Sequence, residues 1–473
     1  MSTASVTAPS ATADVIADWN PEDPQKWSSR QAWLTLWVTT FSLILGFMVW
    51  YMVSVIAPIL QNAQIVDKSH AFWLTSMPGL AGGALRLLWM FLPPVMGTKK
   101  MVAWSSVALM APMIGWFVLL IQPADTLKSS FGLMMVLAFL TGIGGGVFSG
   151  YMPSTSYFFP KSKQGVALGL QAGIGNFGVS VIQLITPILV AVTVFGGGHA
   201  FDNPKIKANA QSKLTFLQTP SLLLFVLLII AAILAFTLLK SVPIKANPRQ
   251  QLDIFRNKHT WFMTLLYILT FGCFSGLAGT FALMLNQMVP HVPTIGWLGG
   301  TTIAFLGAFI GSVSRILWGP LCDRFGGGIW TMVSAIGIGL SAIIVIIALR
   351  QTVFLDTVPE GQVAHCEVPL PLFLTGMFLL FFFAGVGNAA TFKQMPMIFE
   401  PRQAGGVIGW TAAIAAFGPF IFSFSMNQLS GDSNVSNFGT KIVPVFVIVL
   451  IIAIASAAVN WWYYTRPNAE AKC

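Results

Sequence analysis

The chain has 473 residues, of which 55% are hydrophobic and only 8% carry a charged side chain. Soluble domains average about 25% charged residues, so this composition excludes a water-facing surface of ordinary size and predicts a membrane protein. The net charge of +10 does not indicate a nucleic-acid partner, because the lysines and arginines lie mainly in short connections between apolar runs.

Apolar runs long enough to cross a bilayer recur along the whole chain. A polar tail, residues 1–32, precedes six of them, and a basic linker at 240–260 separates these from six more. We therefore expect one six-helix half at 33–239, a second at 261–464, and a short tail at 465–473. The runs lie near 33–60, 72–96, 101–121, 131–158, 165–195 and 218–239, and then near 261–289, 296–321, 330–349, 369–397, 405–429 and 442–464.

The distribution of lysine and arginine predicts how the chain sits in the membrane. If both termini lie on the same side of the membrane, fifteen of the lysines and arginines lie on that side and seven on the other. Positive charge is retained on the cytoplasmic side, so we expect both termini in the cytoplasm. Four cysteines are far apart and show no metal-ligand or redox spacing, so we expect no disulfide, no metal and no cofactor.

The two halves contain matching motifs. Arg86-Leu-Leu-Trp in the second run parallels Arg315-Ile-Leu-Trp in the eighth, and three glycines repeat at a constant offset. Weak symmetry of this kind is typical of major-facilitator transporters, whose substrate lies near the midplane between the repeats. The glycine pairs are Gly165 with Gly405, Gly169 with Gly409, and Gly178 with Gly418.

Positive charge inside the apolar runs is the strongest functional signal. All fifteen acidic residues fall in tails, loops or helix ends, whereas Arg86 and Arg315 lie mid-run and Lys393 lies within 369–397. Each charge at bilayer depth costs about 2.5–3.5 kcal/mol, and no carboxylate is available to balance it. A site for a small anion explains the arginines, because a guanidinium binds planar oxyanions with two parallel bonds. Snorkelling or bonding to carbonyls is the alternative, and for Lys393 snorkelling is as good an explanation.

Aromatic and glycine residues near these cations have two explanations. Tyr267 and Phe271 are four residues apart and share one helix face, and Phe148 is flanked by glycines. Simple packing is the favoured explanation for such aromatic residues. The stretch 165–178 is dense in glycine. This pattern favours either close helix packing or sliding of the helix during transport, with Asn176 as a polar contact. Its glycines are Gly165, Gly169, Gly173, Gly175 and Gly178.

The segment 319–328, GPLCDRFGGG, resembles the major-facilitator loop signature G-x-L-x-D-R-x-G-G. In that superfamily the signature serves as a conformational latch, which implies this role for Asp323 and Arg324. The first half has no Asp-Arg pair at the corresponding place. Any latch is therefore expected on one side only.

Over nearly its whole length the chain resembles the nitrate/nitrite porter family of the major facilitator superfamily, in its exchanger branch. The resemblance rests on the two glycine-rich helices, GVALGLQAGIGNFG and GGVIGWTAAIAAFG, on the paired arginines, and on the opening DWNPEDPQKW. It implies a monomeric, multi-pass protein of the bacterial inner membrane that carries nitrate and nitrite. By resemblance, Arg86 and Arg315 bind the anion, and Phe148, Tyr267, Phe271 and Asn176 line the site. Lys393 stands where exchangers have a neutral residue.

The positive charges of Arg86 and Arg315 predict that the protein exchanges one anion for another. Without an acidic residue in the core, an empty site holds two cations that repel each other, so reorientation is expected only with an anion bound. Proton-coupled nitrate uptake is an alternative, with Lys393, Tyr267 or a water carrying the proton. An anion channel, or a carrier of another small oxyanion, is also compatible with the sequence. An enzyme is not indicated, because the core shows no Ser-His-Asp set, metal cluster or phosphate-binding loop.

Overall fold

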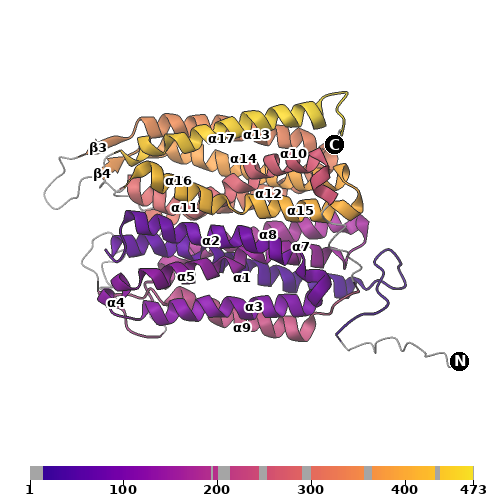
Figure 1. Cartoon of the computed structure of the whole chain (residues 1–473), viewed down its shortest axis with the longest axis horizontal. Helices are drawn as coiled ribbons and strands as arrows, with labels where there is room; N and C mark the ends of the chain where they lie inside the picture. Colours follow the sequence, from indigo (N-terminus) through magenta and orange to yellow (C-terminus); the bar gives the residue numbers. More distant parts are fainter. Residues whose placement is uncertain are drawn as a thin grey trace.

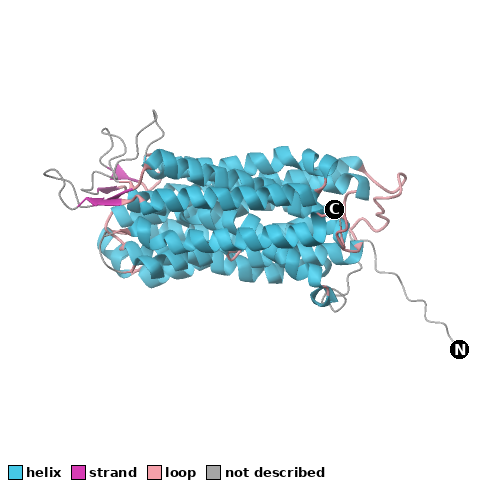
Figure 2. Cartoon of the chain, turned by 90° about the horizontal axis from the view of Figure 1, so that it is seen from above, coloured by secondary structure: helices cyan, strands magenta, loops and turns pink. Residues whose placement is uncertain are grey.

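The computed structural model describes residues 14–192, 195–200, 214–243, 253–289, 300–355, 365–431, 437–471 and 473. Long helices run side by side along the molecule (Figures 1 and 2). The described residues nearest the two termini lie at one end of this bundle, which we call the terminal face, and the short elements α4, β3 and β4 lie at the opposite end, the far face. The helices of the first half of the chain form one layer of Figure 1 and those of the second half form the other.

The first half of the chain contains nine helices and two short strands among its described residues. They are α1 (Ser29–Asn62), α2 (Lys68–Trp89), α3 (Leu92–Leu120), α4 (Ala124–Ser129), α5 (Phe131–Thr141), α6 (Ile143–Gly146), α7 (Phe148–Ser156), α8 (Lys161–Leu189), β1 (His199–Ala200), β2 (Leu214–Thr215) and α9 (Thr219–Leu238).

The second half continues from the linker, of which residues 244–252 lie outside the described part of the chain. Its elements are α10 (Lys258–Tyr267), the π-helical turn η2 (Ile268–Gly272), α11 (Cys273–Met288), the 3₁₀ turn η3 (Gly300–Ala304), α12 (Phe305–Phe325), α13 (Gly327–Arg350), β3 (Val353–Leu355), β4 (His365–Glu367), α14 (Leu370–Ile398), α15 (Pro401–Ala415), α16 (Gly418–Ser430), α17 (Phe438–Asn460) and the π-helical turn η4 (Trp461–Thr465).

Eleven helical spans in the described residues are long and apolar enough to cross a membrane. To these α2 adds a further helix of 22 residues that is less apolar, partly because it carries Arg86. The predicted all-helical membrane fold is confirmed. Two short antiparallel strand pairs, β1 with β2 and β3 with β4, were not predicted. They lie in the long connections after α8 and α13, where enough chain is available to fold back on itself.

Local residue chemistry sets several helix boundaries. Ser28 and Asp67 accept hydrogen bonds from the first turns of α1 and α2, which satisfies backbone N–H groups that lack helical acceptors. Gly97 has φ of 72°, so α3 bends sharply there. Gly326, with φ of 91°, separates α12 from α13. Glycine adopts these positive φ angles without steric penalty.

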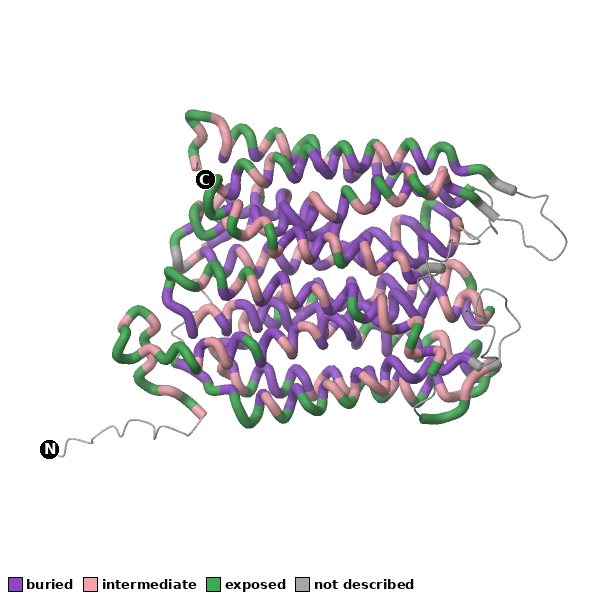
Figure 3. The backbone as a smooth tube through the Cα atoms, turned by 180° about the vertical axis from the view of Figure 1, so that it is seen from behind, coloured by how far each residue is buried: buried purple, intermediate pink, exposed green. Residues whose placement is uncertain are grey.

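The outer surface of the bundle is apolar. Buried residues fill the interior and exposed ones follow the outer helices (Figure 3). On α17, for example, Ile448, Ile451 and Ile454 are 56%, 58% and 63% exposed. An apolar belt of this kind is unfavourable in water and favourable against lipid tails, so this is a multi-pass membrane protein.

Hydrogen bonds between the two helix groups, α1–α9 and α10–α17, are concentrated toward the far face. At the far ends of α1 and α11, Asn62 Nδ2 donates to Asn286 Oδ1 at 2.9 Å, and Gln287 Nε2 donates to Gln61 Oε1 at 2.7 Å. Near the start of α2, the Thr75 hydroxyl meets a serine hydroxyl of α16 at 2.6 Å. Among the described residues, no hydrogen bond joins the groups between the level of Arg86 and the terminal face.

Candidate anion site between the helix groups

Arg86 lies in α2 and is fully buried, with 0% of its surface exposed. Its Nε donates to the carbonyl oxygen of Gly145 and its Nη1 to that of Ala412, each at 2.8 Å. Gly145 belongs to α6 and Ala412 to α15, so this side chain connects the two helix groups. Its Nη2 is buried and meets no hydrogen-bond acceptor among the described residues. Carbonyls therefore hold two nitrogens of Arg86, and the third is left free for a ligand.

Aromatic rings surround the Arg86 guanidinium. Its central carbon lies 5.3 Å from the ring centre of Trp50, 4.7 Å from that of Phe148 and 5.0 Å from that of Phe271. Ring faces carry partial negative charge and attract a cation, by about 2 kcal/mol or more where water is excluded. These contacts stabilise the buried positive charge when no anion is present.

Arg315 lies in α12 and is 4% exposed. Its Nη1 is also buried without an acceptor among the described residues, and its central carbon lies 4.8 Å from the ring centre of Phe392 on α14. Arg86 lies over Phe148 and Arg315 over Phe392, and these two rings are 6.3 Å apart, so two like charges share one buried region. The Tyr267 hydroxyl is buried and makes no hydrogen bond of normal geometry within the described part of the chain.

Four rings link the two arginines. Phe148 and Phe271 are stacked at 6.4 Å with 23° between their planes, and Tyr267 stacks on Phe271 at 5.4 Å. Phe392 lies 6.3 Å from Phe148 and 5.3 Å from Tyr267. We call these four rings, together with Arg86 and Arg315, the arginine–aromatic cluster. Its members come from α2, α7, α10, η2, α12 and α14, so both helix groups contribute to it.

Within the described residues, the cluster has no acidic counter-charge. None of the buried residues in the described part of the chain is Asp or Glu. Two buried cations without a carboxylate partner indicate a binding site for an anionic ligand. Chemically, the cluster can bind a small oxyanion through the free N–H groups of both arginines.

Asn176 was expected at the same site. It lies in α8 and is 0% exposed, and neither side-chain polar atom has a partner among the described residues. No ring or hydrogen-bond contact of the described residues joins it to the arginine–aromatic cluster. Its placement within the site therefore stays a prediction.

The glycines of the two signature helices fall into two classes. A Cβ at Gly178 would lie 2.3 Å from the carbonyl oxygen of Ile44, and a Cβ at Gly418 would lie 2.3 Å from that of Gly272. Gly173 and Gly175 are packed as closely, against Ile316 and Leu43. A Cβ at Gly409 would make only ordinary contact, and one at Gly165, Gly169 or Gly405 would meet nothing within 4 Å.

Lys393 does not lie in the arginine–aromatic cluster. Its Nζ lies 2.5 Å from Oδ1 of Asp323, and the two side chains are 39% and 56% exposed. The expectation that Lys393 has no carboxylate partner is therefore wrong. Asp323 and Arg324 occupy the last turn of α12, which extends further than the apolar run ending at 321. The side chain of Arg324 lies over the ring of Phe325, at 5.1 Å.

Sequence reasoning missed Trp50 and Phe392. Both contact a guanidinium, but the sequence has 16 tryptophans and 38 phenylalanines, and no spacing separates these two from residues that only pack. Sequence reasoning also missed the carbonyls of Gly145 and Ala412, because every residue has a backbone carbonyl and the sequence does not show which ones accept a hydrogen bond.

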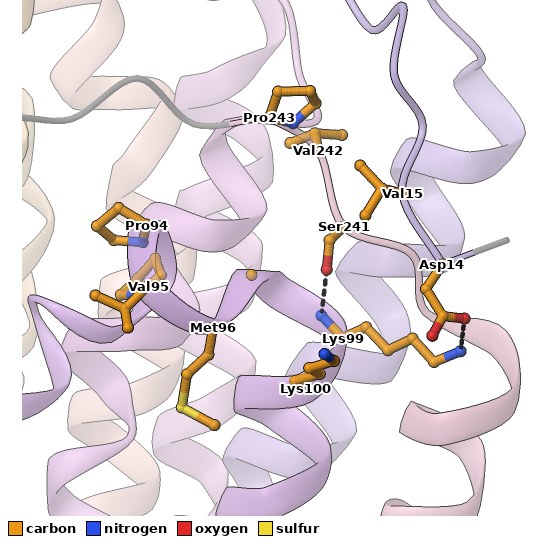
Figure 4. Close-up of a pocket in the computed structure, with 12 residues that line it drawn as sticks. Asp14, Val15, Pro94, Val95, Met96, Lys99, Lys100, Ser241, Val242 and Pro243 are labelled. Carbon is orange, nitrogen blue, oxygen red and sulfur yellow. Dashed lines mark hydrogen bonds and ion pairs between the residues drawn. The ribbon is translucent and has the colours of Figure 1, made fainter. Parts of the chain in front are cut away.

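A separate pocket of about 320 Å³ opens at the terminal face (Figure 4). Lys99 lines it and forms an ion pair with Asp14, while its backbone N–H donates to the Ser241 hydroxyl. The bonds hold the described part of the N-terminal tail against the start of α3. Of its two lysines, Lys99 is already paired, and the pocket contains no member of the arginine–aromatic cluster.

Comparison with known proteins agrees with this architecture. Residues 39–359 match the model of the Major Facilitator Superfamily. The chain is 47% identical to the "Probable nitrate/nitrite antiporter NarK2" of Thermus thermophilus, covering 98% of this chain and 99% of that protein. It is 29% identical to the nitrate/nitrite transporter NarU of Escherichia coli K12, covering 97% and 98%.

Among solved structures, a D-xylose–proton symporter superposes with a TM-score of 0.63 at 14% identity, covering 91% of this chain and 97% of that one. This likeness supports the fold alone. The family match over 39–359 and the relative from Thermus thermophilus identify a transporter and not an enzyme. The chain is a member of the Major Facilitator Superfamily and, within it, of the nitrate/nitrite porter family.

Proposed function

We propose that this protein exchanges nitrate for nitrite across the membrane by alternating access. One observation carries the proposal: among the described residues, two buried guanidinium groups each keep a nitrogen without an acceptor, and no carboxylate is buried. The relative from Thermus thermophilus, 47% identical, is named as a nitrate/nitrite antiporter. Nitrate and nitrite are planar oxyanions, which suit the flat geometry of a guanidinium.

The proposed cycle depends on charge. An anion bound between Arg86 and Arg315 offsets their repulsion, and the two helix groups then rock around it. Since the empty cluster keeps two cations on neighbouring rings, return without an anion is unfavourable, and a second anion has to be carried back. Asn176 would contact the anion from α8, and the pair Asp323–Lys393 with Arg324 would act as a latch at the terminal face.

The orientation is part of the proposal. Fifteen of the lysines and arginines accompany the termini and seven lie on the other side, which supports cytoplasmic termini. The membrane would be the bacterial inner membrane, with nitrate entering and nitrite leaving. We propose a monomer as the functional unit.

Exchange is tested with purified protein in liposomes. We expect rapid uptake of labelled nitrate into nitrite-loaded vesicles and little uptake into empty ones, with no dependence on a pH gradient. Uptake into empty vesicles driven by an inward proton gradient would instead show proton symport. Conductance without any counter-anion would show a channel, and exchange of sulfate or chloride at equal rates would refute the proposed substrate class.

Lys393→Met tests whether this lysine participates in binding or proton coupling. Because its ammonium is half exposed and paired with Asp323, solvent and salt screen it, and the KM for nitrate is expected to change by less than about twofold. Asp323→Asn serves as the matched control for loss of the same ion pair. A tenfold rise in KM in Lys393→Met alone would place the lysine in the anion site.

A further inference from the structure

Asn388 is a buried polar residue for which the proposed cycle has so far no role. It lies in α14 and is 0% exposed, and neither Oδ1 nor Nδ2 has a hydrogen-bond partner among the described residues. A buried amide that stays unpaired is unfavourable, and natural proteins rarely retain one without a ligand or water. The contrast with Asn460 is informative, since that equally buried amide donates to Gly328 at 2.8 Å and to Thr465 at 2.9 Å.

The helix register directs Asn388 toward the arginine–aromatic cluster. Phe392 follows one turn later and Met395 two turns later, so the three residues share one face of α14. On that face Phe392 contacts the guanidinium of Arg315. The Met395 sulfur lies 3.6 Å from the hydroxyl of Thr411, the residue before the carbonyl that accepts from Arg86.

The packing of α14 on α12 brings Asn388 to the level of Arg315. One turn before Asn388, a Cβ at Gly385 would lie 2.0 Å from the Ser314 hydroxyl, so the two helices touch there. One turn after Asn388, Phe392 lies over Arg315 at 4.8 Å. Asn388 is therefore bracketed by two positions that contact the Ser314–Arg315 segment. Arg315 Nη1, which lacks an acceptor among the described residues, comes from this same segment.

We propose that Asn388 binds the transported anion and distinguishes nitrate from nitrite. Its Nδ2 donates a hydrogen bond to one oxygen of the anion, and the other oxygens accept from the free N–H groups of Arg86 and Arg315. The proposal rests on the function proposed above. Nitrate has three oxygens, which can meet Arg86, Arg315 and Asn388 together, whereas nitrite has two and can satisfy both arginines alone. The amide therefore favours nitrate.

The test measures KM for nitrate and for nitrite separately in counterflow with purified variants in liposomes. In Asn388→Ala we expect KM for nitrate to rise about tenfold, the effect of one lost hydrogen bond to a charged ligand, while KM for nitrite rises less than about threefold. In Asn388→Asp the new carboxylate occupies Arg315, so exchange of both anions is expected to fall at least about a hundredfold. Asn460→Ala is the matched control: it should lower thermal stability and leave the ratio of the two KM values unchanged.

Each result decides the question. A selective rise in the nitrate KM supports the proposal, provided that the variant is monodisperse. Unchanged constants, or equal changes for both anions with lowered stability, would overturn it and leave Asn388 as a structural or water-bound residue. Asn388→Asp with full exchange would overturn it as well, even if Asn388→Ala failed to fold. If the unaltered protein exchanges neither anion, the proposed function itself fails, which is a separate outcome.

Discussion

Replacement of Arg86 by lysine is expected to abolish most nitrate–nitrite exchange, with a loss of about a hundredfold or more in kcat/KM. The guanidinium bonds Gly145 and Ala412 through two nitrogens and keeps a third free. A single ammonium cannot make these bonds in the same directions. The expected loss is therefore one of geometry, since the positive charge is retained. Counterflow of labelled nitrate in liposomes measures it.

Arg350→Lys provides a control for the substitution itself. Arg350 is exposed in the last turn of α13, at the far face, so its replacement should leave exchange unchanged. The Arg86→Lys protein has to elute as a monodisperse peak and bind detergent as the unaltered protein does. Wild-type nitrate affinity in that variant would remove Arg86 from the binding site.

Gly178→Ala is expected to destabilise the protein strongly, and Gly169→Ala in the same helix is expected not to. At Gly178 the new methyl group would lie 2.3 Å from the Ile44 carbonyl oxygen and 3.1 Å from Phe47 Cβ. The first neighbour is backbone, so α8 and α1 would have to separate, at a cost of about 1–3 kcal/mol or more. At Gly169 a Cβ meets nothing within 4 Å, and the change removes backbone freedom, which stabilises a helix by about 0.5–1 kcal/mol.

Thermal unfolding of the two variants in the same detergent measures this difference. We expect a lower midpoint temperature or a lower yield for Gly178→Ala, and an equal or higher midpoint for Gly169→Ala. Equal midpoints would mean that α1 and α8 tolerate separation and that close packing is not the role of Gly178.

The sequence predicts the features that violate the rules of a membrane helix. Arg86 and Arg315 could be singled out because a charge within an apolar run is rare and needs a reason. Tyr267 and Phe271 could be placed together because four residues span one helical turn. In the structure they stack with 5° between their ring planes.

Contacts between distant helices were not predictable in the same way. Asp323 pairs with Lys393 because the C-terminal ends of α12 and α14 lie side by side. The sequence of neither segment predicts this alignment. Phe392 and Trp50 are apolar residues in apolar runs, so their contacts with the guanidinium groups depend on helix rotation. The bend at Gly97 was also hidden, since a glycine in such a run is equally consistent with close packing.

The bonds between the helix groups make the two entrances of the bundle unequal. Amide and hydroxyl pairs such as Asn62–Asn286 and Thr75–Ser423 close the far entrance, and each contributes about 0.5–1.5 kcal/mol. At the other entrance the described residues form no hydrogen bond between the groups and make apolar contacts, such as Met90 with Gly409. Without an anion, the equilibrium between the two conformations therefore favours the one that is open at the terminal face. The energy released when an anion binds has to exceed the loss of those polar pairs before the opposite entrance can open.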